Sequence, residues 1–287
     1  MILTIDAGNS RIKWALWQQD KIAEQGAVSY ERAALMPTLQ EALVALSRPA
    51  AVYAVCVAGE TVTRALSEWV ERQWQLPVTF LQTQKRYRHI RHAYPEPSQH
   101  GADRWAAVVA AHYLYPESNL CIIGAGTAIT FDFIDAGGKH RGGYILPSWN
   151  SMHRALTVDT ANVVSQIDAG GQQYQESPVL PDNTRDAVNA GLDLLLQAGI
   201  RAICHKGLAE ITVAPGPEVE KTEDKKALQT DNVKTGIIVS GGFAQTILDW
   251  QDLWSGMPEM IHQPDLVMQG LYRIMRQPDT GSAGAGS

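Results

Sequence analysis

Residues 1–18 read MILTIDAGNSRIKWALWQ, in which two apolar runs flank a short polar stretch that contains Gly8. The pattern predicts a strand over residues 2–5, a tight turn, and a returning strand over residues 13–18. Because glycine lets a phosphate group come close to main-chain N–H groups, the turn is able to hold a phosphate. Taken alone, the turn is explained better by an ordinary Asx turn.

Side chains around this turn supply groups that a bound nucleotide needs. Asn9 and Ser10 offer hydrogen-bond donors, and Lys13 offers a positive charge. Asp6, at the end of the predicted strand, is able to hold Mg²⁺ directly or through a water molecule.

The second half of the chain begins with the same plan. Residues 120–134 read LCIIGAGTAITFDFI, which predicts a strand over 120–123, a turn over 124–127 and a strand over 128–134. The likeness lies in the order of elements and not in an exact repeat of residues. It predicts two related lobes with a cleft between them, the kind of place where ligands usually bind. Two phosphate-binding turns facing such a cleft can hold both ends of a polyphosphate.

Strands and helices alternate along the rest of the chain, which predicts an α/β fold with helices packed on a mixed sheet. Further strands are expected over residues 51–57, 78–81, 144–146 and 236–240. Helices are expected over residues 31–46, 61–74, 101–114, 183–204 and 266–274. Loops are expected over residues 84–100 and 211–234, the second of them mobile, and Gly142 with Gly143 is expected to break the chain before the strand over 144–146.

Composition and charge place the chain among globular proteins and narrow the range of its partners. Of its 287 residues 45% are hydrophobic, and the formal net charge is −6. Without a basic surplus we expect no nucleic-acid partner. Without an apolar run of about 18 residues or a signal-peptide pattern we expect no membrane partner. Three widely spaced cysteines, Cys56, Cys121 and Cys204, suggest neither a disulfide framework nor a zinc site, and fit a reducing cytoplasm.

A third motif, Gly101-Ala102-Asp103-Arg104, opens a predicted helix. Exposed N–H groups at a helix start favour an anion, and an arginine there can bind a carboxylate with two hydrogen bonds. Asp103 can act as a general base for a hydroxyl group. The alternative is a helix-start charge beside a surface ion pair, and the motif alone does not separate the two.

Two other features are explained more simply by structure. Ser240-Gly241-Gly242-Phe243 can let a purine or ribose pack on bare backbone, although a tight connection from strand to helix is the simpler interpretation. The eight histidines show no metal-ligand spacing, and we expect His89, His92 and His100 to be solvated in a polar loop.

Together these motifs resemble the type III pantothenate kinases, a family that includes the Bvg accessory factors. The resemblance runs from residue 2 to about residue 274, and the order and spacing of its markers are highly specific. The markers are DAGNSRIK at 6–13, YPEPSQHGADRW at 94–105, GAGTAITFD at 124–132, GGYILP at 142–147, NTRDAVNAG at 183–191, SGGFA at 240–244 and PDLVMQGL at 264–271.

The resemblance implies an actin-like ATPase (ribonuclease H-like) fold with two related lobes. We place the N-terminal lobe at residues 1–114 and the C-terminal lobe at residues 115–276, followed by a disordered tail at 277–287. It further implies a cytoplasmic homodimer with its active sites at the interface.

The resemblance also implies a reaction: transfer of the γ-phosphate of ATP to the primary hydroxyl of pantothenate, giving 4'-phosphopantothenate in the first step of coenzyme A biosynthesis. Asp103 is implied as the catalytic base. ATP and its Mg²⁺ would be held by Asp6, Gly8, Asn9, Ser10, Lys13, Gly126 and Thr127. Pantothenate would be held by Tyr94, Gly101, Ala102, Asp103, Arg104 and Thr184.

The chain departs from the family at three positions. Gly124 stands where the family has an aspartate that binds a monovalent cation, K⁺ or NH₄⁺. Ser148 replaces a glycine, and Ser240 replaces a threonine. Since Asp6 and Asp103 are intact, we expect an active enzyme with an altered cation requirement.

Two alternatives remain open. One is a catalytically weakened, nucleotide-binding regulatory protein on the same fold. The other, which we rank low, is a different actin-like activity, such as a sugar or acetate kinase or a chaperone ATPase, for which the chain is short.

Overall fold

The computed structural model describes residues 1–159, 180–213 and 233–277, and these residues form two units. The first unit comprises Met1–Pro116, Gly138–His140 and the described residues from Asp265 onward; the second comprises Glu117–Gly137 and the described residues of Arg141–Pro264. The predicted C-terminal lobe included residues 265–276, whereas the structure groups them with the first unit. Most of the loop predicted at 211–234, and the tail after residue 277, lie outside the described residues.

The first unit is built on a five-stranded sheet in the order β3-β2-β1-β4-β5. The strand β2 pairs antiparallel with both β3 and β1. The pairs β1 with β4 and β4 with β5 are parallel. The strands are β1 (Ile2–Ala7), β2 (Arg11–Gln18), β3 (Lys21–Ser29), β4 (Ala51–Cys56) and β5 (Val78–Phe80). The hairpin predicted at the N-terminus is therefore present.

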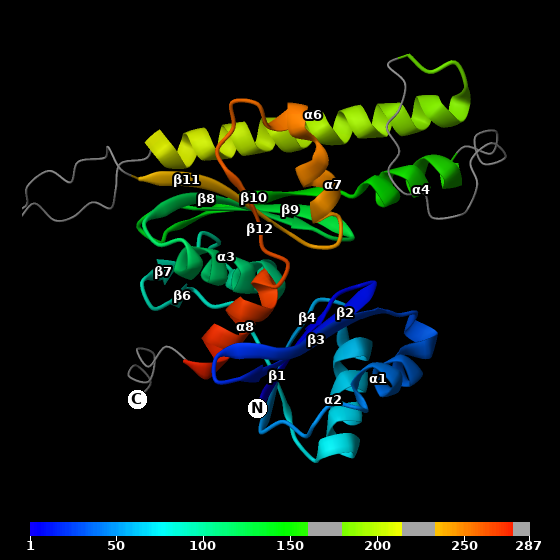
Figure 1. The fold of residues 1–287 in the computed structure, drawn as a ribbon, viewed down its shortest axis with the longest axis vertical. Helices are drawn as coiled ribbons and strands as arrows, with labels where there is room; N and C mark the ends of the chain where they lie inside the picture. The colour runs from blue at the N-terminus through cyan, green and yellow to red at the C-terminus, as the bar shows by residue number, and fades with distance from the viewer. Residues whose placement is uncertain (160–179, 214–232, 278–287) are drawn as a thin grey trace, which may run out of the picture. The chain divides into compact units, whose positions relative to one another are not determined.

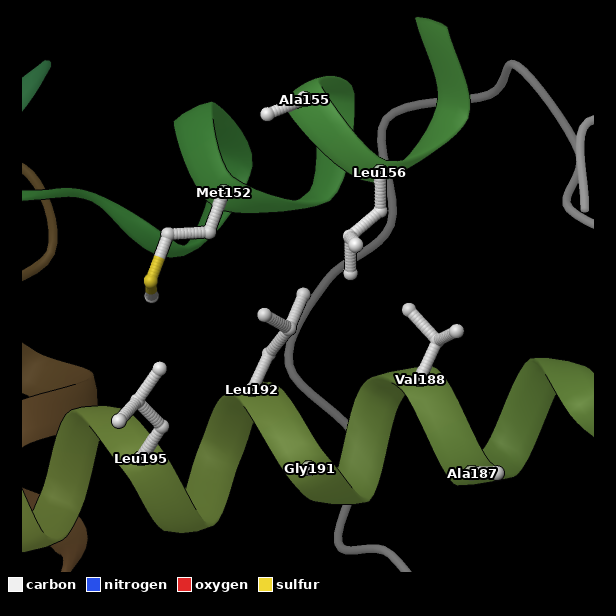
Figure 2. A pocket seen from close by; sticks show the side chains of 8 residues that line it. All are labelled: Met152, Ala155, Leu156, Ala187, Val188, Gly191, Leu192 and Leu195. Carbon is white, nitrogen blue, oxygen red and sulfur yellow. The ribbon is translucent and has the colours of Figure 1, made fainter. Parts of the chain in front are cut away.

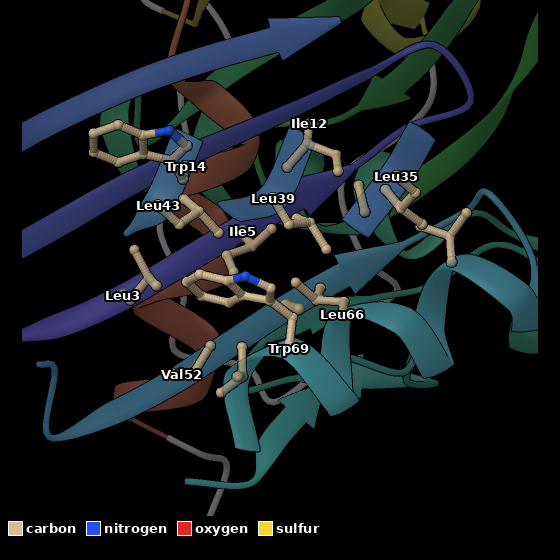
Figure 3. Packing of buried hydrophobic residues seen from close by; sticks show 14 of the residues in the cluster. Leu3, Ile5, Ile12, Trp14, Leu35, Leu39, Leu43, Val52, Leu66 and Trp69 are labelled. Carbon is tan, nitrogen blue, oxygen red and sulfur yellow. The ribbon is translucent and has the colours of Figure 1, made fainter. Parts of the chain in front are cut away.

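Two helices, α1 (Leu35–Leu43) and α2 (Glu60–Trp74), cover one face of this sheet (Figure 1). In α1 the buried leucines recur every four residues, which places them on one side of the helix. Leu3 and Ile5 of β1 point into the same cluster, where Leu39 and Trp69 meet them (Figure 3). Because side chains alternate along a strand, Thr4 and Asp6 must point to the opposite face.

The opposite face is covered by α3 (Ala102–Leu114) and α8 (Leu266–Arg276), which pack against each other. The ring of Tyr272 in α8 stacks on Trp17 of β2, with ring centroids 4.2 Å apart. The indole N–H of Trp17 donates in turn to the Thr4 hydroxyl at 2.7 Å. Residues from the two ends of the chain thus close this face of the sheet.

A short 3₁₀ helix, η1 (Arg32–Ala34), lies between β3 and α1. Between β5 and α3 lie the paired strands β6 (Arg86–Tyr87) and β7 (Ile90–Arg91) and the 3₁₀ helix η2 (Pro97–Gln99). The region predicted as a loop over 84–100 therefore contains one small hairpin and one helical turn.

The second unit repeats the plan of the first, with the strand order β10-β9-β8-β11-β12. As in the first unit, the hairpin of β8 and β9 is antiparallel, and the pairs β8 with β11 and β11 with β12 are parallel. The strands are β8 (Ser118–Ala125), β9 (Ala128–Ile134), β10 (His140–Pro147), β11 (Lys234–Ser240) and β12 (Met260–His262). The matching strand orders confirm the prediction of two related α/β lobes.

The helices of the second unit are α4 (Trp149–Asp159), α6 (Thr184–Val213) and α7 (Ala244–Asp249), with the 3₁₀ helix η4 (Gln251–Trp254). Leu196, Ile200 and Cys204 of α6 are buried against the hairpin of β8 and β9. Among the described helices, α6 alone has the length and hydropathy of a membrane-spanning segment, criteria that core helices of soluble proteins also meet.

Three elements differ from the sequence-based expectation for identifiable reasons. The strand β3 was missed because it is an edge strand whose side chains are mostly exposed, so it lacks a clear apolar alternation. The expected break at Gly142 and Gly143 is wrong, because the edge strand β10 runs through both. The helix α6 continues past Cys204 to Val213 through Gly207, a residue type that disfavours helix interiors but here gives the ring of Phe133 room to pack.

Candidate active site

The turn between β1 and β2 is a closed loop whose tip is exposed. The Gly8 N–H donates to the Arg11 carbonyl at 3.0 Å, and the Tyr30 hydroxyl donates to the Gly8 carbonyl at 2.8 Å. A Cβ at Gly8 would lie 3.4 Å from the Arg11 carbonyl oxygen, which is close to an ordinary van der Waals contact. Asn9 and Ser10 are exposed at the tip, where a ligand can reach them. Tyr30 was not predicted, because nothing in the local sequence links it to a turn 22 residues earlier.

Asp6 and Lys13 face each other across the hairpin, since they are register partners in β1 and β2. The pKa of Asp6 is raised to about 7, first by burial and then by the negative charge of Asp103, while Lys13 opposes the rise. The fold therefore brings the start of α3 within electrostatic reach of the first turn. Two carboxylates with one ammonium group form a place that attracts a cation.

The start of α3 is shaped by Gly101. A Cβ at this position would lie 2.5 Å from Asp103 Oδ1, so glycine makes room for the carboxylate to fold back over the helix start. The Gly101 carbonyl accepts the Trp105 N–H at 3.0 Å and begins the helical bonding. Arg104 is only 8% exposed, which argues against the explanation of its side chain as part of a surface pair.

Tyr94 lies in the segment between β7 and α3, in a cluster of rings. Its N–H donates to His92 Nδ1 at 3.0 Å, and its ring centroid lies 5.1 Å from that of His100. The prediction that these histidines are solvated is wrong for two of the three, because His92 is half-buried and His100 is 2% exposed. The ring of His92 packs near the buried Trp105, and both histidines pack near the buried His140, which is far from them in the sequence. His89 is exposed, as predicted.

In the second unit, the corresponding turn joins β8 and β9. The Gly126 N–H donates to the Ala128 carbonyl at 3.0 Å, and Gly126 and Thr127 are exposed. The Ser151 hydroxyl donates to the Thr127 carbonyl at 3.2 Å and lies 3.1 Å from the hydroxyl of Ser148. Ser148, one of the departures from the family, thus belongs to a hydroxyl pair that supports this turn.

Gly124 pairs with Thr130 across the two strands. A Cβ at Gly124 would lie 2.6 Å from Thr130 Oγ1, so the threonine hydroxyl occupies the space that a larger residue at position 124 would need. Asp132, the nearest carboxylate along β9, is 2% exposed and pairs with Ile122, two register steps away.

The Ser240-Gly241-Gly242 turn packs against the end of β8. Gly241 has a φ of +105°, and a Cβ there would lie 2.3 Å from the Ala125 carbonyl oxygen. The Phe243 N–H donates to the same carbonyl at 3.1 Å. These contacts favour the interpretation of a tight connection between strand and helix, and the packing of a purine or ribose here stays a prediction.

Thr184 is the first residue of α6 and is exposed. The preceding Asn183 caps the helix, because its Oδ1 accepts the Asp186 N–H at 3.0 Å and its amide donates to the Asp186 carboxylate at 2.7 Å. Of the predicted site residues, the structure brings Asp6, Lys13 and Asp103 together in the first unit. Gly126, Thr127 and Thr184 belong to the second unit.

A family model and the most similar curated proteins that we compared with this chain all point to the same family. Residues 2–206 match the family model for type III pantothenate kinase. A type III pantothenate kinase of Nitrosococcus oceani is 32% identical over 281 residues, which cover 96% of this chain and 94% of that protein. The corresponding protein of Alkalilimnicola ehrlichii is 31% identical over 275 residues, covering 96% of this chain and 98% of that protein.

Solved structures add information on the fold. A Sinorhizobium meliloti protein named for 2-dehydro-3-deoxygalactonokinase has a TM-score of 0.56 at 12% identity and covers 100% of both chains. A Campylobacter jejuni protein named for the Baf family has a TM-score of 0.50 at 18% identity, covering 96% of this chain and 97% of that one. With the repeated strand order, this likeness shows the actin-like ATPase fold.

Proposed function

This chain belongs to the type III pantothenate kinase family and is an enzyme of that type, and we propose that Asp103 is its catalytic base. The family uses pantothenate and ATP as substrates. In the proposed reaction the γ-phosphate of ATP passes to the primary hydroxyl of pantothenate and gives 4'-phosphopantothenate, the first intermediate on the way to coenzyme A.

The observation that carries the proposal is the approach of Asp103 to the first turn, seen in its effect on the pKa of Asp6. Phosphoryl transfer depends mainly on positioning and charge neutralisation, so the acceptor and the nucleotide must be held close together. Asp103 is partly exposed at the start of α3, and in the proposed mechanism it accepts the proton of a bound hydroxyl. Asp6 and the turn after it would hold the nucleotide beside that hydroxyl.

The residues that we propose for ATP binding are Gly8, Asn9, Ser10, Lys13, Gly126 and Thr127. Kinases of this kind use a divalent metal, and Mg²⁺ is the ion that we propose. The charge of the site suits this ion. Asp6 is buried and lies near the negative charge of Asp103, so its own negative charge is not fully balanced by nearby positive charge. Bound Mg²⁺ would supply that charge and neutralise the phosphates. No carboxylate stands at Gly124, so we propose an altered requirement for K⁺ or NH₄⁺.

The proposed pantothenate site uses Tyr94, Gly101, Ala102, Asp103 and Arg104, together with Thr184. Arg104 is suited to the carboxylate of pantothenate, because a guanidinium group forms two parallel hydrogen bonds with a carboxylate. Its burial at 8% exposure would strengthen such a charge pair relative to one in water.

We further propose a cytoplasmic homodimer that uses the α6 face for association. Leu194 and Leu195 of α6 are 71% and 60% exposed, and only 28% of the apolar window of this helix is buried. Beside them, Met152 and Leu156 of α4 face α6 across a groove of about 470 Å³ (Figure 2). Exposed apolar surface of this kind is typical of association sites. The resemblance to the family supports active sites at the dimer interface.

The test is phosphorylation of pantothenate by the purified protein with ATP and Mg²⁺, with the product detected by mass spectrometry. We expect product from the wild type and a loss of roughly 10²- to 10⁴-fold in kcat for Asp103→Asn. Circular dichroism and ATP binding by calorimetry serve as controls that the variant is folded. ATP binding without any product in the wild type would instead support the regulatory alternative.

A further inference from the structure

The segment that carries Tyr94 is closed at both ends by a pair of histidines. His92 Nε2 and His100 Nδ1 lie 3.0 Å apart, at hydrogen-bonding distance. His92 follows β7 directly, and His100 is the last residue before Gly101 at the start of α3. The bond therefore joins the two points between which Tyr94 is held.

The direction of each hydrogen bond follows from the backbone. The Tyr94 N–H is a donor, so His92 Nδ1 must accept, and the proton of this imidazole must lie on Nε2. His92 Nε2–H then donates to His100 Nδ1, which must also accept. Both imidazoles are thereby assigned as neutral, each with its proton on Nε2.

The histidine pair is anchored in the first unit. The His92 N–H donates to the Lys85 carbonyl at 2.9 Å, and the Thr83 hydroxyl donates to the His100 carbonyl at 2.8 Å. The fully buried ring of Trp105 meets the edge of His92, with centroids 4.9 Å apart. Because the pair is tied to buried structure, it can hold Tyr94 in a fixed position.

Tyr94 rests directly on this pair. Its ring centroid is 5.2 Å from that of His92 and 5.1 Å from that of His100, while its N–H is held by His92 Nδ1. Both the backbone and the ring of Tyr94 therefore depend on His92. A change in the pair would move Tyr94 relative to Asp103 and Arg104 without touching the turn between β1 and β2.

We propose that the His92–His100 hydrogen bond is a clasp that positions Tyr94 against the start of α3, which makes both histidines positioning residues for pantothenate. The inference rests on the proposed roles of Tyr94 and of Gly101 to Arg104 in binding pantothenate. Loss of the clasp should weaken pantothenate binding and leave ATP binding intact.

The experiment compares the two Michaelis constants in His92→Ala. We expect the KM for pantothenate to rise roughly three- to tenfold, the range for one hydrogen bond, with the KM for ATP and kcat changed less than about twofold. His92→Asn should restore part of the loss, because its Oδ1 can accept the Tyr94 N–H as in an Asx turn. Thermal unfolding of each variant identifies any that fail to fold.

A double-mutant cycle with His100→Asn tests whether the two residues act together. If the clasp is real, His92→Ala combined with His100→Asn should raise the KM for pantothenate no further than the worse single variant does. Multiplication of the two single effects would overturn the clasp.

The matched control is a second hydrogen-bonded histidine pair, which joins the turn between β6 and β7 to α3. His89 Nε2 lies 2.8 Å from His112 Nε2, in the last turn of the same helix. His89→Ala should leave both Michaelis constants unchanged. An equal rise of both constants in His92→Ala, or the same effect in His89→Ala, would contradict the proposal. Absence of product from the wild type would overturn the proposed function together with the clasp, whereas wild-type product with an unchanged KM in His92→Ala overturns only the clasp.

Discussion

Asp6 lies where a buried strand ends beneath the start of a helix, and this placement changes its acidity. It shares the α3 and α8 face of the sheet with Thr4, because alternate residues of a strand point the same way. Burial and Asp103 raise the pKa of Asp6 to about 7. The ordinary pKa of an aspartate is about 3.9, so the folded protein binds this proton more tightly than the unfolded chain does.

This difference predicts how stability depends on pH. Between about pH 4 and pH 7 the ionised carboxyl is favoured in the unfolded chain, so its contribution to stability falls as pH rises and is lowest above pH 7. In the ligand-free protein, Asp6→Asn should therefore raise Tm at pH 8 and have a smaller effect at pH 5. Differential scanning fluorimetry at both values measures this, with the exposed Glu41→Gln as control. An equal shift at the two pH values would show that the carboxyl is not responsible.

Gly124 predicts an unusual response to potassium. In Gly124→Asp the new side chain must displace Thr130 Oγ1, which lies 2.6 Å from the required Cβ position. We expect this variant to have a lower Tm and an activity that rises with K⁺ more steeply than that of the wild type. Gly124→Asn, which has the same size without the charge, should lower Tm but gain no K⁺ response. The idea fails if wild-type activity rises with K⁺ as steeply as that of Gly124→Asp.

Among the elements, the crossing of α3 and α8 depends most clearly on one residue. A Cβ at Gly270 of α8 would lie 1.9 Å from the carbonyl oxygen of Ala106 in α3. The obstacle is helix backbone, which cannot move aside as a flexible side chain can. The close approach of these helices thus requires glycine, and it covers the sheet face that carries Asp6.

Gly270→Ala should therefore force the two helices apart. We expect a loss of roughly 1–3 kcal/mol in the free energy of unfolding, the usual cost of overpacking, measured by urea denaturation. Gly199→Ala in α6 is the matched control, because its Cβ would make only an ordinary contact of 3.6 Å with Leu146. That variant should be neutral or more stable by up to about 1 kcal/mol, since alanine is the better helix former. Equal destabilisation of both variants would argue against the crossing as the cause.

At the scale of the whole molecule, the exposed leucines of α6 predict association. Leu194→Glu combined with Leu195→Glu should convert a dimer into a monomer, because charges at an apolar interface lose their hydration. Light scattering after size-exclusion chromatography measures the mass. Val44→Glu, at an exposed apolar residue of the first unit, should leave the dimer intact. A wild-type protein of monomer mass would rule out the proposed homodimer.

The fold was predictable because its signals are local. The two apolar runs around each glycine turn are read from neighbouring residues, so both hairpins and the α/β class followed from the sequence. The edge strand β3 was missed since its mostly exposed side chains carry little apolar alternation. The grouping of α8 with the first unit was also missed, because a helix pattern does not tell which sheet the helix will cover.

The same distinction holds for the candidate site. The sequence was sufficient to select Asp6 and Asp103 as candidate functional residues, since each lies in a recognisable motif. Their mutual influence came from folding, because 96 residues separate them along the chain and only the packing of α3 on the sheet brings them close. The histidines His92 and His100 were misjudged for the same reason: a polar segment reads as solvated until Trp105 and His140 pack against it. The sequence by itself determines residue types and local patterns. Burial, electrostatic coupling and hydrogen-bond partners are decided only by the tertiary structure, because they depend on segments that are distant in the sequence.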